Sequence, residues 1–211
     1  MKILFQGDSI TDAWRDRENP HDMGEGYPHY ASAMLRDVFP DVDFEFINLG
    51  IGGDRTTEIL ARLESDIIEQ QPDIVSLLVG INDVWHRYLP DIGRETTDEQ
   101  FEENLRTILS AIKERTSACI LLMEPFLLEE VDPQKSEMTE ELVRKQAIVR
   151  RLGEEYADAY LPLHKYLHTA AEEQSFYSAD GVHLTADGAC AVGEVYLGAI
   201  TPLVELLTKE A

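Results

Sequence analysis

The sequence is poor in cysteine and has no long apolar run. Only Cys119 and Cys190 occur among 211 residues, and both lie in apolar surroundings. We therefore expect two buried free thiols rather than a disulfide. No stretch approaches the roughly 18 apolar residues of a membrane-spanning helix. The short apolar start at residues 1–7 does not fit a signal peptide, so we expect a cytoplasmic protein.

Basic residues are also scarce. The chain has 18 Lys and Arg against 41 Asp and Glu, a formal net charge of −23. A surface this acidic repels phosphate backbones and anionic lipid headgroups, so neither a nucleic-acid partner nor a membrane partner is expected. It favours neutral or cationic substrates.

Several signatures of common enzyme classes are missing. The sequence has no phosphate-binding loop, no dinucleotide-binding glycine motif, no His-Glu-x-x-His and no Cys-x-x-Cys. It also lacks Gly-x-Ser-x-Gly, which disfavours the usual α/β-hydrolase. The histidines outside the motifs described below lack metal-ligand spacing. We expect no metal and no cofactor.

Short apolar runs alternate with longer amphipathic segments along the whole chain. Most of these runs are continuously hydrophobic, as expected for parallel strands that are covered on both faces. The alternation predicts an α/β sandwich in which helices cover both sides of the sheet, built as a single domain over residues 1–211. The expected strands are residues 3–6, 44–49, 74–79, 119–123 and 159–163.

The amphipathic segments carry recognisable helix signals. Thr97 and Gln100 have the spacing of a capping box ahead of one apolar face. Residues 59–68 show the same periodicity, and a last helix should begin near Thr185. The long irregular stretches at residues 11–26, 84–96 and 125–138 each follow a strand, so they should meet at one edge of the sheet. In open α/β sheets that edge binds ligands.

Four short motifs lie at the ends of these strands. Each motif alone also fits an ordinary turn or helix cap. All four in order, at one edge of a sheet, favour a catalytic site instead. They are Gly-Asp-Ser-Ile-Thr at 7–11, Gly-Ile-Gly-Gly-Asp-Arg-Thr at 50–56, Gly-Ile-Asn-Asp at 80–83 and Asp-Gly-Val-His at 180–183.

These motifs contain the groups that acyl transfer needs. A serine hydroxyl becomes a good nucleophile when an imidazole accepts its proton, and a carboxylate orients that imidazole. Asp180 and His183 are spaced to form such a pair within one turn. Gly53 can offer a backbone N–H, and Asn82 an amide N–H, to a developing oxyanion.

The four motifs resemble the four sequence blocks of the SGNH hydrolases, also called GDSL-type esterases, in order and spacing. The resemblance implies that Ser9 is the nucleophile of a triad with Asp180 and His183. It also implies an oxyanion hole formed by the N–H groups of Ser9 and Gly53 and the side chain of Asn82.

The same resemblance extends from residue 7 to residue 188 and implies a fold. The family has a flavodoxin-like three-layer α/β/α sandwich with a five-stranded parallel sheet, which agrees with the strand pattern. Ile10 stands where the family name has leucine. We expect it to pack inward and to leave the mechanism unchanged.

A second resemblance, limited to a short segment, concerns the acyl group and the alcohol of the ester substrate. Residues 80–88 are similar to the equivalent stretch of bacterial acetylxylan esterases, which implies an acetyl ester of a neutral carbohydrate such as a xylo-oligosaccharide. The alternatives are a general short-chain esterase, lysophospholipase or thioesterase with the same triad, or a non-catalytic carbohydrate-binding relative. The resemblance also allows a homo-oligomer.

Aromatic residues near the active edge are candidate contacts for the sugar. Trp14, Trp85 and Tyr88 are expected there, and flat aromatic faces suit sugar rings. Packing of Trp85 beneath its loop is the alternative. We take Asp8, Trp14 and Trp85 as candidate substrate-binding residues, although Asp8 and Asp83 also fit a supporting role as turn carboxylates.

Overall fold

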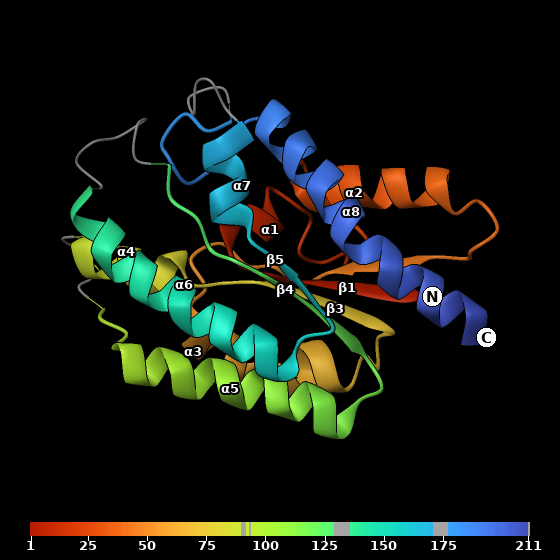
Figure 1. Cartoon of the computed structure of the whole chain (residues 1–211), viewed down its shortest axis with the longest axis horizontal. Coiled ribbons are helices and arrows are strands. Elements are labelled where there is room, and N and C mark those ends of the chain that lie inside the picture. Colours follow the sequence, from red (N-terminus) through yellow and green to blue (C-terminus); the bar gives the residue numbers. More distant parts are fainter. Residues whose placement is uncertain (90–91, 93, 129–135, 171–176, 211) are drawn as a thin grey trace.

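Five parallel strands form the centre of the structure, a computed structural model that describes residues 1–89, 92, 94–128, 136–170 and 177–210 (Figure 1). The strand order is β2-β1-β3-β4-β5. The strands are β1 (Lys2–Gly7), β2 (Glu45–Asn48), β3 (Ile74–Leu78), β4 (Cys119–Met123) and β5 (Ala159–Leu161). All five were predicted from their apolar runs, with ends that differ by at most two residues. The five-stranded parallel sheet and the α/β sandwich are therefore confirmed.

Helical segments connect the strands. They are α1 (Ser9–Asp12), α2 (Tyr27–Val38), α3 (Thr56–Ala61), the π-helical turn η1 (Glu64–Ile68), α4 (Ile81–Tyr88), α5 (Asp98–Arg115), α6 (Ser136–Tyr156), α7 (Leu163–Ala170) and α8 (Ala186–Glu210). Helices α2, α7 and α8 lie on one side of the sheet, and α3, α5 and α6 lie on the other (Figure 1).

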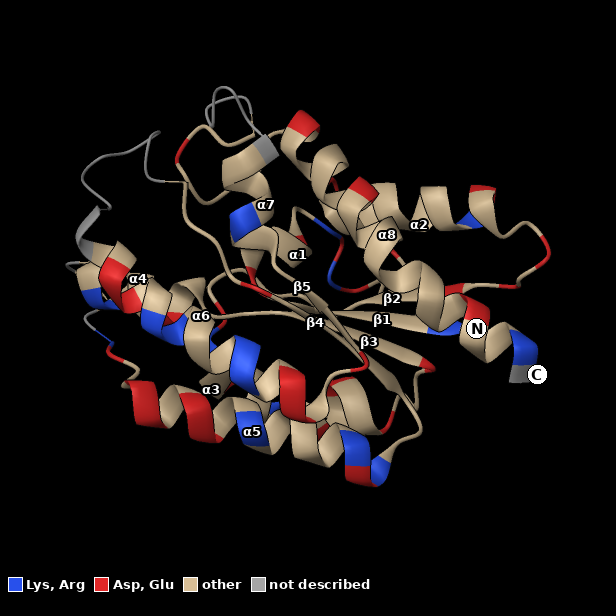
Figure 2. Ribbon diagram, viewed as in Figure 1, with Lys and Arg blue, Asp and Glu red and all other residues tan. Residues whose placement is uncertain are grey.

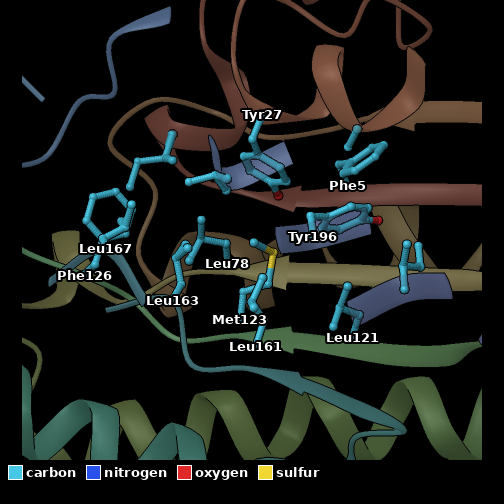
Figure 3. Close-up of a cluster of buried hydrophobic side chains, with 14 of the residues drawn as sticks. Phe5, Tyr27, Leu78, Leu121, Met123, Phe126, Leu161, Leu163, Leu167 and Tyr196 are labelled. Atoms are coloured by element: carbon cyan, nitrogen blue, oxygen red, sulfur yellow. The ribbon is translucent and has the colours of Figure 1, made fainter. Parts of the chain in front are cut away.

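Each side of the sheet has its own apolar core. Under α2 and α8, the ring of Tyr196 lies 5.4 Å from that of Phe5 and 5.8 Å from that of Tyr27 (Figure 3). The Tyr196 hydroxyl reaches through this core to the hydroxyl of Ser76, at 2.6 Å. A buried tyrosine needs such a partner, because an unpaired hydroxyl costs free energy in an apolar core.

Helix α5 begins as its sequence predicts. The Thr97 hydroxyl accepts the backbone N–H of Gln100, and the Gln100 side chain accepts the backbone N–H of Thr97, both at 3.2 Å. The predicted helix over residues 59–68 differs, because α3 ends at Ala61 and the chain continues as the π turn η1. The wider turn lets Ile67 and Ile68 both reach the core.

The predicted irregular stretches are shorter in the structure. Residues 84–88 belong to α4 and residues 11–12 to α1, while residues 136–138 begin α6. Part of the stretch at 125–138 lies outside the described residues. All three stretches still follow the carboxyl ends of β1, β3 and β4, which are level with one another because Gly7 pairs with Leu78 and Leu78 with Met123.

Helix α8 corrects one expectation from the sequence. Over Ala186–Lys209 its length and mean hydropathy of 1.5 are sufficient for a membrane span, although the sequence has no continuous apolar run there. Its glycines and alanines raise the average, and few charges lie along it (Figure 2). Here Val192, Tyr196 and Val204 are fully buried in the core. A long helix in a protein core can therefore be as apolar as a membrane-spanning helix.

Neither cysteine forms a disulfide, as predicted. Both are half-buried rather than buried, since Cys119 opens an inner strand and Cys190 lies in the first turns of α8.

Candidate active site

Ser9 is the first residue of α1, directly after β1. The side chain of Asp8 caps this turn, because its Oδ1 accepts the N–H of Ile10 at 3.0 Å. Backbone φ angles of +39° at Ala13 and +65° at Trp14 end the turn at once. The left-handed conformation is costly for a residue with a Cβ atom, so the surrounding contacts must hold it.

The Ser9 hydroxyl meets an imidazole from the other end of the chain. Its Oγ lies 3.1 Å from Nε2 of His183, and Nδ1 of His183 lies 2.7 Å from Oδ2 of Asp180. The three side chains thus form one continuous hydrogen-bonded series. In this series Nδ1–H donates to the carboxylate, which leaves Nε2 free to accept the serine proton.

Asp180 is held in its ionised form. Its partial burial alone would raise its pKa, but hydrogen bonds from the His183 ring and from the N–H groups of Val182 and His183 lower the pKa well below the usual range. Ser178 supports this turn by donating to the carbonyl of His183 and accepting the N–H of Gly181. A carboxylate that stays charged can stabilise an imidazolium beside it.

Gly53 and Asn82 lie on two segments that are joined by hydrogen bonds. The Asn82 amide donates to the carbonyl of Asp54 at 3.0 Å, and the Asp83 carboxylate accepts both the N–H and the hydroxyl of Thr56. Gly53 has a φ of +89°, which favours glycine, and a Cβ there would meet nothing within 4 Å. Among the described residues, no acceptor is found for the N–H of Gly53 or for the second amide hydrogen of Asn82.

The same loop is anchored to the nucleophile turn. Oδ2 of Asp12, on α1, accepts the N–H of Gly52 at 2.8 Å. A Cβ built on Gly52 would lie 3.6 Å from the Cβ of Ser9, so the loop passes close to the nucleophile. Asn48 adds a further link, since its amide donates to the carbonyl of Thr11 and its Oδ1 accepts the N–H of Gly50.

The supporting roles of Asn48 and Asp12 were not predicted from the sequence. Asn48 could have been noticed as a polar residue within an apolar strand. Asp12 gave no signal, because its partner lies 40 positions away.

The structure separates the three residues that were expected to contact substrate. Trp14 is 89% exposed and lines pockets on both sides of Ser9. Trp85 is half-buried, with its ring 5.8 Å from the His183 ring, so it packs beside the imidazole. Asp8 is only 1% exposed, so its side chain lies below the surface, and its contact with substrate stays a prediction. Tyr88 directs its hydroxyl to Glu141 on α6.

Asp8 is a buried carboxyl beneath the nucleophile. Burial is the main reason that its pKa rises to about 7; the Ile10 N–H and His183 oppose the rise, and the nearby Asp83 and Asp54 carboxylates add to it. Its Oδ2 has no hydrogen-bond partner among the described residues. A buried carboxylate with an unpaired oxygen is unfavourable, which favours the protonated form.

Two pockets meet at Ser9 and His183. The first, of about 350 Å³, extends along the start of α2 past Gly26 and Tyr30. The second, of about 730 Å³, is lined by Arg15, Arg17 and Gly52. These volumes suit small ligands. Among the described residues, no group of three or more His, Cys, Asp or Glu is placed to hold a metal ion.

The sequence and the fold are similar to those of known esterases. Residues 5–190 match the GDSL-like Lipase/Acylhydrolase family. An acetylxylan esterase from Geobacillus stearothermophilus is 36% identical over 162 residues, which are 73% of this chain and 72% of that protein.

Solved structures of such proteins also have the same fold as this chain. A GDSL-like lipase from Parabacteroides merdae superposes with a TM-score of 0.89 at 31% identity, covering 96% of this chain and 95% of that one. The acetylxylan esterase Axe2 from Geobacillus stearothermophilus gives 0.81 at 27% identity, covering 96% and 93%. Mutants of Axe2 that are described as catalytic replace a serine, a histidine, or an aspartate three positions before that histidine.

Proposed function

Because the chain belongs to the GDSL-like lipase/acylhydrolase family, we propose that this carboxylic ester hydrolase removes acetyl groups from carbohydrate through a Ser9–His183–Asp180 triad. The observation that carries the proposal is the continuous series of contacts, 3.1 Å from serine to histidine and 2.7 Å from histidine to aspartate. The catalytic mutants of Axe2 concern the same three residue types with the same Asp–His spacing.

The reaction begins with proton transfer. Nε2 of His183 accepts the Ser9 proton as Oγ attacks the ester carbonyl, and Asp180 stabilises the imidazolium that forms. The imidazolium then protonates the departing sugar oxygen, which leaves an acetyl group on Ser9. A water molecule, deprotonated by His183, attacks this acyl-enzyme and releases acetate.

The tetrahedral intermediates carry a negative oxygen that needs fixed donors. In our proposal these are the N–H groups of Ser9 and Gly53 and the amide of Asn82. The support for this assignment is the rigidity of the segment. Asp54 and Thr56 are bonded to Asn82 and Asp83, and Gly52 is bonded to Asp12, so the donors need not reorganise when the charge appears.

The sugar assignment has two supports. The relatives that are named acetylxylan esterases match most of this chain. Trp14 also presents a large aromatic face to solvent beside the nucleophile, where a sugar ring can stack.

Acetate release from acetylated xylo-oligosaccharides tests the proposal, measured beside hydrolysis of p-nitrophenyl acetate and p-nitrophenyl octanoate. We expect rapid deacetylation of the sugar and poor cleavage of octanoate. Ser9→Ala should lower kcat on the order of 10⁴-fold or more, because no other group replaces the nucleophile. Ser65→Ala, at an exposed serine of η1, is the matched control and should retain activity.

The outcomes separate the parts of the proposal. Cleavage of the nitrophenyl esters without sugar deacetylation would keep the triad and exclude the carbohydrate assignment. Full activity in Ser9→Ala would exclude Ser9 as the nucleophile.

A further inference from the structure

The second pocket beside Ser9 contains an unusual grouping of charge for an acidic protein. The Asp12 carboxylate lies between two guanidinium groups, those of Arg15 and Arg17. Arg17 donates to Oδ2 of Asp12 through Nε and Nη2. Nε of Arg15 lies 3.9 Å from Oδ1 of Asp12. Two positive charges thus share one negative charge.

These contacts do not provide an acceptor for every N–H donor of Arg15. Its side chain is 3% exposed and lines the pocket. Its Nε donates to the carbonyl of Gly50 at 3.0 Å, but its Nη1 has no hydrogen-bond partner among the described residues. A buried guanidinium N–H without an acceptor is unfavourable. Arg15 therefore contributes a largely buried positive charge to the wall of the pocket.

Arg17 contributes a second donor at the rim of the same pocket. Its side chain is 54% exposed, and no described residue accepts a hydrogen bond from its Nη1. Guanidinium groups bind carboxylates through parallel N–H donors, and such charge-assisted bonds are stronger than neutral ones.

The remaining wall joins this charged end to the reaction centre. Trp14 supplies an exposed aromatic face, and Gly52, Ser9 and His183 complete the lining. A ligand in the pocket can therefore lie against an aromatic ring, reach the exposed guanidinium of Arg17 near the charge of Arg15, and present an ester to Ser9. The volume of about 730 Å³ is sufficient for more than one sugar ring.

We propose that this pocket recognises a carboxylate on the carbohydrate substrate, so that the enzyme prefers acetylated oligosaccharides that carry a uronic acid unit near the acetylated sugar. The inference rests on the proposed carbohydrate deacetylation, and it replaces the neutral sugar expected from net charge. In salt of about 0.15 M the Debye length is about 8 Å, so the distant acidic surface is screened while the two arginines act at short range.

A pair of substrates tests this preference. The first is an acetylated xylo-oligosaccharide with a uronic acid branch next to the acetylated unit, and the second is its carboxyl-reduced, neutral counterpart. The unmodified enzyme should show a kcat/KM about tenfold higher for the acidic substrate, from one added charge-assisted contact. Arg17→Gln should bring this ratio of acidic to neutral substrate close to one, and Arg17→Lys should restore part of it.

Arg115→Gln is the matched control, because Arg115 is also a half-exposed arginine paired with one carboxylate, that of Glu64, but it lies outside both pockets. It should keep the unmodified ratio. Circular dichroism of each variant verifies folding, and the ratio within one variant is independent of the amount of active enzyme.

Each outcome has a distinct meaning. Equal kcat/KM for the two substrates in the unmodified enzyme would overturn the uronic acid proposal while sugar deacetylation stands. A preference for p-nitrophenyl hemisuccinate over p-nitrophenyl acetate, without a preference among sugars, would assign the carboxylate to the acyl group and also overturn it. Failure to deacetylate either sugar would overturn the proposed function itself.

Discussion

At the residue scale, neighbouring positions in one motif have different tasks. Asn82 donates to the loop that carries Gly53, whereas Asp83 fixes the start of α3 through Thr56. In the first motif Ser9 meets the imidazole, whereas Asp8 is buried beneath it. Asn82 and Asp83 diverge because a helix rotates each residue by about 100° relative to the previous one, whereas Asp8 is the non-helical cap that precedes α1.

Replacement of Asn82 by alanine should mainly lower kcat. Loss of one oxyanion donor costs on the order of 10²–10³ in kcat. Steady-state hydrolysis of p-nitrophenyl acetate measures it. Asn104→Ala is the control, because the Asn104 amide also donates a hydrogen bond to this loop, to the Thr56 hydroxyl rather than the Asp54 carbonyl, but Asn104 lies on α5. An unchanged kcat in folded Asn82→Ala would refute the oxyanion assignment.

Asp8→Asn should make stability less sensitive to pH. The pKa of Asp8 rises on folding from 3.8 to about 7, so the folded state binds more protons between these values. Its contribution to stability is therefore complete below pH 3.8 and is lost as the pH rises through about 7. Asparagine keeps an acceptor for the Ile10 N–H and has no charge.

Urea unfolding at pH 5 and pH 8 measures this effect. From pH 5 to pH 8, the free energy of unfolding of the unmodified protein should fall by about 2 kcal/mol more than that of Asp8→Asn. Asp83, whose pKa burial raises to about 6, contributes equally to both proteins. Asp41→Asn, at an exposed position, should follow the unmodified protein. Parallel pH curves for Asp8→Asn would show that Asp8 is ionised in the folded state.

At the element scale, α1 is too short to be stable by itself. A four-residue helix cannot compensate for the cost of nucleation, so its neighbours must hold it. Asp8 caps its first turn, Asn48 binds the carbonyl of Thr11, and Asp12 binds Gly52. The position of the nucleophile therefore depends on three separate segments.

Helix α5 depends on local sequence instead, and its cap gives a prediction. Thr97→Ala removes the acceptor for the Gln100 N–H and should lower the free energy of unfolding by about 1 kcal/mol. Chemical denaturation measures the change. Thr107→Ala, at an exposed position within the same helix, should have no cost, because alanine favours helix. Equal losses in both variants would argue against the capping box.

At the scale of the whole molecule, the charge of −23 is the dominant feature. Ion pairs such as Arg106–Glu155 link α5 to α6, but the excess carboxylates repel one another in the folded state. Acidic residues lie at the start of α5, and basic residues lie in the middle of α6 (Figure 2). Exposed pairs of this kind contribute at most about 1 kcal/mol each.

Moderate salt should therefore stabilise the protein. Between 10 and 200 mM NaCl the Debye length falls from about 30 Å to below 8 Å, which screens repulsion between distant carboxylates. We expect the Tm to rise by a few degrees in a calorimetric or fluorescence melt at pH 8. At pH 5, where some carboxylates bind protons, the rise should be smaller. A Tm that falls with salt would show that the ion pairs outweigh the repulsion.

The strands, the capping box of α5 and the order of the four motifs could be predicted from the sequence. These features depend on local patterns, namely continuous apolar runs for buried parallel strands and a three-residue spacing for the cap. The contact between Asp180 and His183 was also local, since both lie in one turn.

The contacts that support the site, and the burial of each side chain around it, could be found only from the fold. Asp12 and Gly52 are 40 positions apart, and Asp83 and Thr56 are 27 apart, so no spacing rule joins them. Asp8 and Trp14 are both near Ser9 in sequence, yet one is buried and the other exposed. Burial depends on the neighbours that the fold brings to each position, and that information is spread over the whole chain.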